Sequence, residues 1–233
     1  MRDDKTKTVV YTATREMYEN LAICVRSLLK NGNVDEVYLV LENYDKKLMA
    51  LCPGKVVVIC ARDQLIFPEY GVNYHSRWTY MALMKAAMHR LPDFKDKDRV
   101  LVLDCDTLVE EDLSPLWKMD LTDYYFAMVR QRSDGRNGDF SADAPYFNTG
   151  VMMCNLDELR DGKGDEIINR LNTHYYEYPE QDCINKLCRG KIKELPGRYN
   201  YCEFNIQDSK CIIRHYAANK NWTNTAQARA YEE

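Results

Sequence analysis

Two aspartates stand one residue apart at the end of an apolar run, and their spacing is the first sign of chemistry in this sequence. Residues 99–103 read Arg-Val-Leu-Val-Leu and lead directly into Asp104, Cys105 and Asp106. An apolar run of this length predicts a strand that is buried on both faces. Because residues two apart on an extended chain point the same way, both carboxylates should project to one side and Cys105 to the other.

Neighbouring carboxylates are costly to bury, because the two negative charges repel each other and lose their hydration. A divalent cation removes that cost, and hard oxygen ligands suit magnesium or manganese. The carboxyl end of a buried strand in an α/β sheet is also where such sheets bind ligands. Asp104 and Asp106 are therefore candidate metal ligands, although an Asp after a strand can equally cap or turn the chain.

A third candidate ligand ends the last predicted strand, at residues 211–215. This segment reads Cys-Ile-Ile-Arg-His, so that His215 follows an apolar pair. An imidazole beside two carboxylates would favour manganese over calcium. Taken alone, His215 is equally consistent with a strand-end side chain that is satisfied by hydrogen bonds.

The elements that must position these side chains alternate between strands and helices. Before the aspartates, short apolar runs predict three strands, at residues 8–12, 37–41 and 56–59. Apolar side chains recur at helical spacing over residues 15–30, and a second helix is predicted over residues 77–91, ended by Pro92. Strand, helix and strand at this spacing are typical of a parallel crossover unit, so we expect an α/β fold.

The pattern continues after the central strand. Further strands are predicted at residues 125–129 and 192–196, a loop and strand at residues 146–155, and further helices at residues 162–171 and from residue 179. Residues 130–143 are rich in Ser, Asp, Gly and Asn, and we expect a mobile loop there. Without a linker or a repeat, the sequence predicts one domain over residues 1–225 and a polar C-terminal tail, an exposed helix, over residues 226–233.

Composition narrows the class of protein. Of the 233 residues, 45% are hydrophobic and 29% are charged, which allows a substantial core and argues against disorder. The formal net charge of -4 argues against a surface built for non-specific nucleic-acid binding. Nine cysteines include no Cys-x-x-Cys pair, which argues against a zinc site or a disulfide framework.

The sequence also carries an expectation about location. The first five residues are polar apart from Met1, and no apolar run approaches the length that spans a bilayer. We therefore expect no signal peptide, no stable membrane insertion and a cytoplasmic protein.

Six segments, taken together and in order, resemble the family-8 glycosyltransferases. These are retaining enzymes with the GT-A fold, a Rossmann-like mixed and mainly parallel central sheet flanked by helices, and they include glycogenin and bacterial lipopolysaccharide galactosyltransferases. The segments are residues 10–14 with Tyr18, then 103–109, 147–151, 180–185, 195–200 and 215–222. The resemblance covers nearly the whole chain.

The resemblance implies a metal-dependent transfer of a hexose from a UDP-sugar, UDP-glucose or UDP-galactose, to an acceptor with retention of the anomeric configuration. Asp104, Asp106 and His215 would bind Mn²⁺ or Mg²⁺, and Lys220 would bind the diphosphate. The loop over residues 130–143 would close over the donor and limit its hydrolysis by water.

The same resemblance implies roles for other side chains. Donor-binding residues would be Thr12, Ala13, Tyr18, Asp104, Asn148, Thr149 and Glu180. Among these, Tyr18 would stack on the uracil. Gln181 and Asp182 would lie beside the anomeric carbon as catalytic residues, together with Lys220. Because an amide is a poor nucleophile, we expect Gln181 to position and stabilise the sugar in a same-face substitution.

Three positions depart from the family's pattern. Ala82 stands where the family usually carries an Arg, and Arg77 or Lys85, each about one turn away, are the candidates to supply a cation instead. Glu180 replaces the usual Asp, which keeps the charge but moves the carboxylate outward by one methylene. Ala218 replaces the usual Gly in a closing segment that is one residue shorter than the family's.

Two other functions stay open at this point. A sugar nucleotidyltransferase would need a Gly-rich phosphate loop after the first strand, and residues 12–15, Thr-Ala-Thr-Arg, contain no glycine. A non-catalytic nucleotide-sugar-binding protein of the same fold is compatible with Ala82 and the shortened closing segment. The acceptor, whether a glycan, a lipid-linked sugar, a protein or a modified nucleic acid, is not encoded in the shared motifs, because loops form acceptor surfaces.

Overall fold

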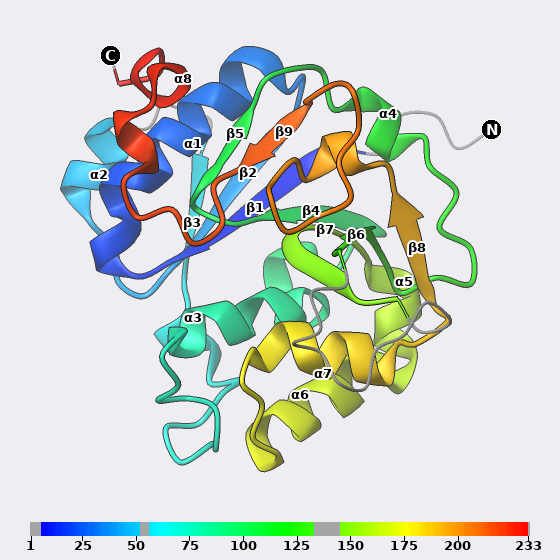
Figure 1. Cartoon of the computed structure of the whole chain (residues 1–233). Helices are drawn as coiled ribbons and strands as arrows, with labels where there is room; N and C mark the ends of the chain where they lie inside the picture. Colours follow the sequence, from blue (N-terminus) through cyan, green and yellow to red (C-terminus); the bar gives the residue numbers. More distant parts are fainter. Residues whose placement is uncertain (1–5, 52–55, 133–144, 233) are drawn as a thin grey trace.

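A seven-stranded sheet forms the centre of the protein (Figure 1). The computed structural model describes residues 6–51, 56–132 and 145–232. The strand order is β3-β2-β1-β4-β7-β6-β8. Their bounds are β1 Thr8–Ala13, β2 Glu36–Leu41, β3 Val56–Cys60, β4 Arg99–Leu103, β6 Phe126–Arg130, β7 Phe147–Asn155 and β8 Ile192–Leu195.

Six of these strands run in one direction. β3, β2, β1 and β4 pair in parallel, and β8 pairs in parallel with β6. β7 alone among them is antiparallel to its neighbours β4 and β6. The prediction of an α/β fold with a mixed, mainly parallel sheet is therefore confirmed. β4 occupies the middle, and its Val100 and Leu103 are fully buried, as the apolar run predicts.

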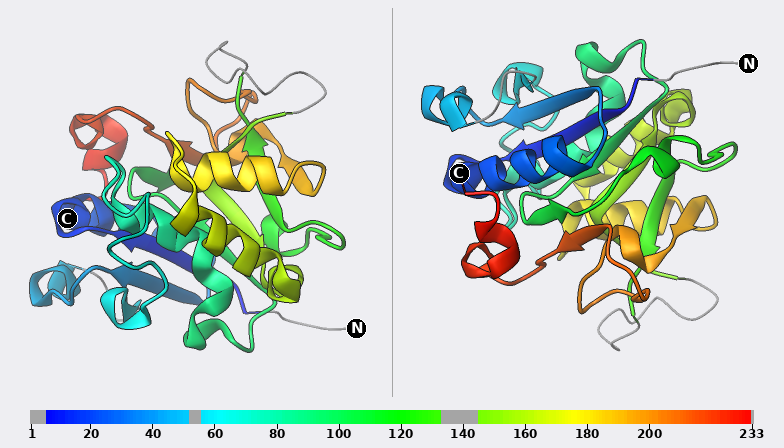
Figure 2. Two further views of the ribbon diagram at one scale, coloured as in Figure 1. Left: turned by 90° about the horizontal axis from the view of Figure 1, so that it is seen from below. Right: turned by 90° about the horizontal axis from the view of Figure 1, so that it is seen from above.

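Helices cover both faces of the sheet (Figure 2). One face packs against α1 and buries Leu21, Val25 and Leu28 of that helix, whereas the other packs against α3, α6 and α7. The helix bounds are α1 Tyr18–Asn31, α2 Lys46–Leu51, α3 Thr79–Met84, α4 Ser114–Trp117, α5 Leu156–Glu158, α6 Gly164–Thr173, α7 Pro179–Leu187 and α8 Ala226–Arg229. None of the helices in the described ranges is long and apolar enough to cross a membrane.

The protein also has a two-stranded sheet, of which only the second strand was predicted. β5 (Thr107–Val109) follows the aspartate pair and pairs antiparallel with β9 (Ile213–His215), so that Thr107 lies opposite His215. The predicted strand at residues 211–215 is thus shorter, and β5 was not predicted as a strand. This small sheet joins the end of the chain to the turn that follows β4.

Some predicted boundaries shift for local reasons. The helix expected over residues 77–91 begins only at Thr79, where φ is +63°, and continues after α3 as the 3-10 helix η3 (Lys85–Arg90). α2 was not predicted. From residue 133 onward, the expected mobile loop lies outside the described residues.

The C-terminal tail is mostly exposed, as expected, but its helix is short. α8 is a single turn, and its Ala228 is fully buried. Nη1 of Arg26 donates to the carbonyl oxygens of Tyr231 and Glu232 at 3.0 and 2.9 Å. The tail is therefore held against α1, and a domain boundary at residue 225 stays a prediction.

Candidate functional site

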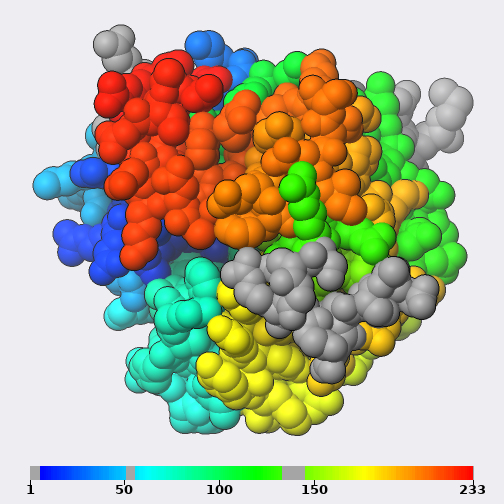
Figure 3. All heavy atoms as spheres, viewed as in Figure 1, coloured from blue at the N-terminus to red at the C-terminus, as the bar shows by residue number. Residues whose placement is uncertain are grey.

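A cavity of about 1490 Å³ opens where β1 and β4 end and β7 begins. Because β7 is antiparallel to β4, its amino end lies at the same edge of the sheet as the carboxyl end of β4. Figure 3 shows that N-terminal (blue), central (cyan and yellow) and C-terminal (orange and red) segments adjoin on one face of the molecule. Segments far apart in the sequence line this cavity, which is where an α/β sheet is expected to bind its ligand.

The three predicted metal ligands lie close together in the cavity. One ligand atom each from Asp104, Asp106 and His215 lies within 4.8 Å of the others. Nε2 of His215 is 3.2 Å from Oδ1 of Asp106 and 3.9 Å from Oδ2 of Asp104. The pairing of β5 with β9 explains this approach, because it sets His215 beside the strand that leaves the aspartate turn.

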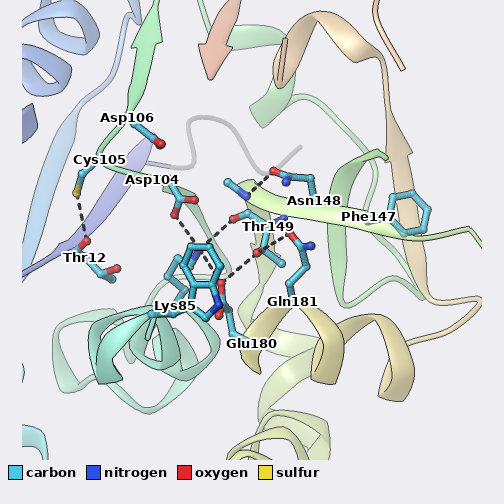
Figure 4. Close-up of polar contacts among 12 residues, drawn as sticks. Thr12, Lys85, Asp104, Cys105, Asp106, Phe147, Asn148, Thr149, Glu180 and Gln181 are labelled. Carbon is cyan, nitrogen blue, oxygen red and sulfur yellow. Dashed lines mark hydrogen bonds and ion pairs between the residues drawn. The ribbon is translucent and has the colours of Figure 1, made fainter. Parts of the chain in front are cut away.

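The aspartate turn is fixed by its neighbours. The backbone N–H of Asp104 donates to the carbonyl oxygen of Gly150 at 2.9 Å. Cys105 lies between the aspartates and points away from them, as predicted, and its Sγ donates to the carbonyl oxygen of Thr12 at 3.2 Å (Figure 4). The two carboxylates of Asp104 and Asp106 are thereby left facing the cavity.

A chain of amides orients His215. Oδ1 of Asn200 accepts from Nδ1 of His215 at 2.8 Å, and Nδ2 of Asn200 donates to Oδ1 of Asn148 at 2.8 Å. The backbone N–H of Gly150 donates to the same Asn148 oxygen at 2.9 Å. A Cβ at Gly150 would overlap the imidazole ring, so only glycine allows this packing. With Nδ1 engaged, Nε2 faces the aspartates, as metal-binding histidines are usually arranged.

The charges of this cluster fit a divalent cation. Burial alone would lower the pKa of His215, but the Asp106 carboxylate outweighs it and raises that pKa to about 10. Burial also opposes the charge on Asp106, but the positive imidazole lowers the pKa of its carboxyl below the ordinary value. The arrangement thus attracts positive charge to Nε2, and two carboxylates with one oriented imidazole nitrogen suit Mn²⁺ or Mg²⁺.

A buried lysine forms ion pairs with two carboxylates on the other side of the site (Figure 4). Nζ of Lys85 is 2.7 Å from Oδ1 of Asp104 and 2.9 Å from Oε1 of Glu180, and its side chain is only 5% exposed. Burial alone would lower the pKa of Lys85, but the two carboxylates raise it, so the ammonium is charged. Of the two candidate cations, Lys85 is therefore the one in the cluster, and the exposed Arg77 pairs with Glu177 instead.

Gln181 is held at both ends of its amide. Its Oε1 accepts from the backbone N–H of Thr149 at 3.0 Å, and its Nε2 donates to the hydroxyl of Tyr146 at 2.9 Å. That hydroxyl donates to Oδ1 of Asp182 at 2.6 Å, while the backbone N–H of Tyr178 donates to Oδ2 of Asp182 at 2.9 Å. Burial raises the pKa of the Asp182 carboxyl. In this arrangement Asp182 fixes Tyr146, and Tyr146 fixes Gln181.

The expected nucleotide-binding residues divide into two groups. Thr12 and Ala13 line the cavity at the end of β1. Tyr18 is not among the lining residues: its ring is buried in the core, and its hydroxyl donates to the carbonyl oxygen of Asn43 at 2.7 Å. Stacking of Tyr18 on a uracil stays a prediction, and it would require this side chain to leave its present contacts.

The closing segment also reaches the cavity. Lys220 is exposed and lines it, together with Ala218. Ala218 has φ of +64°, in the left-handed region that disfavours a residue with a Cβ. Ala218, at the position where the family usually carries glycine, therefore adopts a backbone conformation that favours glycine.

Sequence reasoning gave no role to two residues of this site. Tyr146 directly precedes a recognised motif, and its adjacency to that motif was the available signal. Asn200 was quoted in a motif, but its hydrogen bond to His215 depends on tertiary structure. Lys85 was named as one of two candidates, and it lies one helical turn after Ala82.

The fold of this chain is of the GT-A type. Residues 8–226 match the sequence model of Glycosyl transferase family 8, and the chain therefore belongs to that family. Solved structures of similar fold include the galactosyltransferase LgtC in complex with donor and acceptor sugar analogues. Its TM-score is 0.70 at 18% identity, over 95% of this chain and 93% of that one. Mouse xyloside xylosyltransferase 1 gives a TM-score of 0.70 at 15% identity, over 93% and 99%.

Curated relatives are similar in sequence over most of this chain. A putative glycosyltransferase of Haemophilus influenzae is 25% identical over 84% of this chain and 64% of its own length. The lipopolysaccharide 1,2-glucosyltransferase of Escherichia coli K12 is 25% identical over 82% of this chain and 61% of its own length. The chain thus spans less than two thirds of the length of these relatives.

Proposed function

We propose that this protein transfers a hexose from a UDP-sugar, UDP-glucose or UDP-galactose, to an acceptor with retention of configuration. Membership of the family and the similarity to a bacterial glucosyltransferase support this donor class. One observation carries the proposal: Asp104 joins the candidate metal-binding triad through one carboxylate oxygen and a buried lysine cluster through the other. Both clusters line one cavity.

The triad would serve the departing diphosphate. Asp104, Asp106 and His215 would hold Mn²⁺ or Mg²⁺. A divalent cation bound there supplies Lewis-acid stabilisation of the negative charge that develops on the leaving group. Lys220, on the wall formed by the closing segment, would add a point charge to the same phosphates.

The lysine cluster would serve the sugar. Asn148, Thr149, Glu180 and Asp104 offer oxygen and nitrogen atoms to its hydroxyls, and Thr12 with Ala13 would contact the nucleotide base at the end of β1. Lys85 keeps both carboxylates in place and balances their charge in a buried setting.

Gln181 would act beside the reacting carbon. In a same-face substitution, the bond from the anomeric carbon to the phosphate oxygen breaks and the bond to the acceptor oxygen forms on the same side. The proton of the acceptor hydroxyl passes to the departing phosphate oxygen. The amide of Gln181 would position the sugar and stabilise its positive charge without a covalent bond, and Asp182 would act through Tyr146.

The test is turnover of a panel of sugar nucleotides with Mn²⁺, Mg²⁺ or EDTA. We expect release of sugar from UDP-glucose or UDP-galactose with a divalent cation, and none with EDTA. The variant Asp106→Asn should lower turnover by about a hundredfold or more, because the cation contributes several kcal/mol to the transition state. Asp112→Asn, which removes an exposed carboxylate outside the cavity, is the matched control.

Other outcomes of the same assay would overturn the proposal. Binding of UDP without release of sugar from any donor would indicate a nucleotide-sugar-binding protein. With pyrophosphate added to the assay, formation of UTP and a sugar 1-phosphate from a UDP-sugar would indicate a nucleotidyltransferase.

A further inference from the structure

One wall of the cavity carries an exposed indole that the proposed donor site does not use. Trp78 immediately precedes α3, lines the cavity and is 44% exposed. Large aromatic side chains contribute most when they are covered, and an exposed one on a cavity wall is typical of a binding surface. A ligand that covers this ring would recover that contribution.

The indole ring is fixed in place. Its Nε1 donates to the carbonyl oxygen of Glu177 at 2.9 Å. The ring of Tyr178 lies 5.5 Å from it, centroid to centroid, at an interplanar angle of 34°. Cζ of Arg77 is 5.0 Å from the centroid of Trp78 and 5.4 Å from that of Tyr178. A ring held by these contacts loses little freedom when a ligand binds, which favours affinity.

The aromatic pair lies next to the sugar-binding residues. Trp78 immediately precedes α3, and the 3-10 helix η3 that carries Lys85 continues directly from α3. Tyr178 is two residues before Glu180, at the start of α7. The base of a UDP-sugar is expected at Thr12 on β1, which leaves the aromatic pair to a second substrate.

Polar groups flank the rings. Arg77 and Glu177 form an ion pair at 3.2 Å, with side chains 60% and 67% exposed. They offer hydrogen-bond donors and acceptors beside an apolar surface. A pyranose ring needs this combination, because its C–H face is apolar and its hydroxyls lie around the edge.

We propose that Trp78, Tyr178, Arg77 and Glu177 form the acceptor subsite, and that the acceptor is a pyranoside whose C–H face stacks on Trp78. The proposal rests on the proposed function for the transfer step alone. The acceptor hydroxyl is then presented from the side of the cavity that carries Glu180 and Gln181.

Tryptophan fluorescence tests the binding step without turnover. The probes are methyl α- and β-pyranosides of glucose, galactose, mannose and N-acetylglucosamine, added with UDP and Mn²⁺ present. Of the other tryptophans, Trp222 is fully buried and Trp117 is half-buried, so a bound glycoside should act on the emission of Trp78. We expect a saturable change in the wild-type protein and none in Trp78→Phe.

Kinetics test the role of the ring in transfer. Trp78→Ala should raise the KM for the accepted glycoside roughly tenfold, the loss typical of one stacking contact. Trp78→Tyr should restore part of it. Donor hydrolysis without acceptor should change less than about twofold in both variants, since the donor contacts stay intact. Tyr175→Ala removes an exposed aromatic ring that lies three residues before Tyr178 and outside the cavity. It should change neither the acceptor KM nor the rate of donor hydrolysis.

The outcomes separate this proposal from the proposed function. The acceptor subsite is wrong if no glycoside changes the emission, or if Trp78→Ala leaves the acceptor KM unchanged. It is also wrong if Trp78→Ala lowers donor hydrolysis as much as transfer, because the ring would then serve the donor or the fold. If glycosides change the emission of Trp78 but no UDP-sugar is turned over, the subsite stands and the proposed function fails.

Discussion

The proposed metal site (the metal side) and the proposed sugar site (the sugar side) are built differently, although both include Asp104. On the metal side, Asp106 and His215 come from a turn and a three-residue strand, and two carboxylates face one imidazole. On the sugar side, Lys85 and Glu180 come from helices packed on the large sheet, and each is bonded to a partner within the protein.

The two sides differ in how their charged groups are paired when no ligand is bound. On the sugar side, other residues of the protein supply the ion-pair and hydrogen-bond partners, so these contacts stabilise the folded state without a ligand. On the metal side, the charged imidazole of His215 pairs with Asp106 when no cation is bound, and a divalent cation would replace the proton on that imidazole. We therefore expect changes on the sugar side to lower both stability and activity, and changes around the metal ligands to act mainly on metal affinity and activity.

The largest effect should come from Lys85→Met. Removal of the ammonium leaves the buried carboxylate of Glu180 and the partly exposed carboxylate of Asp104 without their partner. Breaking a buried ion pair in this way costs about 3 to 5 kcal/mol of unfolding free energy. Urea unfolding measures this loss, and the donor-hydrolysis assay should show activity lost as well.

Two controls make this result specific. Lys118→Met removes an exposed lysine and should leave the unfolding midpoint unchanged. The double variant Lys85→Met/Glu180→Gln should recover part of the lost stability, because one of the unpaired charges is gone. If Lys85→Met unfolds at the same urea concentration as the wild type, the ion pairs of Lys85 do not stabilise the folded protein as the contacts indicate.

An intermediate effect is expected at Asn200, which is hydrogen-bonded to His215 and Asn148 but does not itself line the cavity. Asn200→Ala should weaken Mn²⁺ binding about 10- to 100-fold, the usual loss when a residue that orients a metal ligand is removed. Activity measured against Mn²⁺ concentration should shift to higher concentration and recover at saturation.

The matched control is the buried Asn205. Its Nδ2 donates to the backbone carbonyl oxygen of Asn200 at 2.9 Å, and no hydrogen bond to His215 is among its contacts in the described structure. Asn205→Ala should lower stability without a change in the Mn²⁺ dependence. If the Mn²⁺ dependence of activity is the same in Asn200→Ala as in Asn205→Ala, Asn200 only supports the fold.

The metal side could be predicted from sequence because its signals are local. Asp104 and Asp106 directly follow an apolar run, and His215 ends another. What the sequence could not give is the pairing of β5 with β9, since three-residue strands have too few residues for a reliable pattern. That pairing is what brings His215 to the aspartates.

The sugar side was less predictable because it depends on helix geometry. Arg77 and Lys85 were equal candidates under a helix that starts at residue 77. The structure starts it at Thr79 with a positive φ, so Arg77 leaves the helical face that carries Lys85. Tyr18 was expected against the uracil because of the resemblance alone, whereas the structure buries its side chain in the core.

The smallest effect should come from Tyr146→Phe, which removes one hydroxyl and keeps the ring. Gln181 then loses the partner of its Nε2 but keeps the Thr149 N–H at its Oε1. We expect kcat to fall about five- to tenfold, the value of one hydrogen bond of about 1 kcal/mol or slightly more. Donor KM, Mn²⁺ dependence and unfolding should change little. Tyr176→Phe, at a cavity-lining tyrosine without a hydrogen bond to Gln181 among the described contacts, is the control.

A double-mutant cycle decides whether Tyr146 acts through Gln181. If the hydroxyl serves only to hold the amide, Tyr146→Phe should have no further effect on kcat in a Gln181→Ala background. Equal losses in both backgrounds would mean that the hydroxyl contributes separately, through Asp182 or through the substrate. Independent effects would also show that the sugar side consists of separate contacts, because a single hydrogen-bonded unit requires that each change depend on the others.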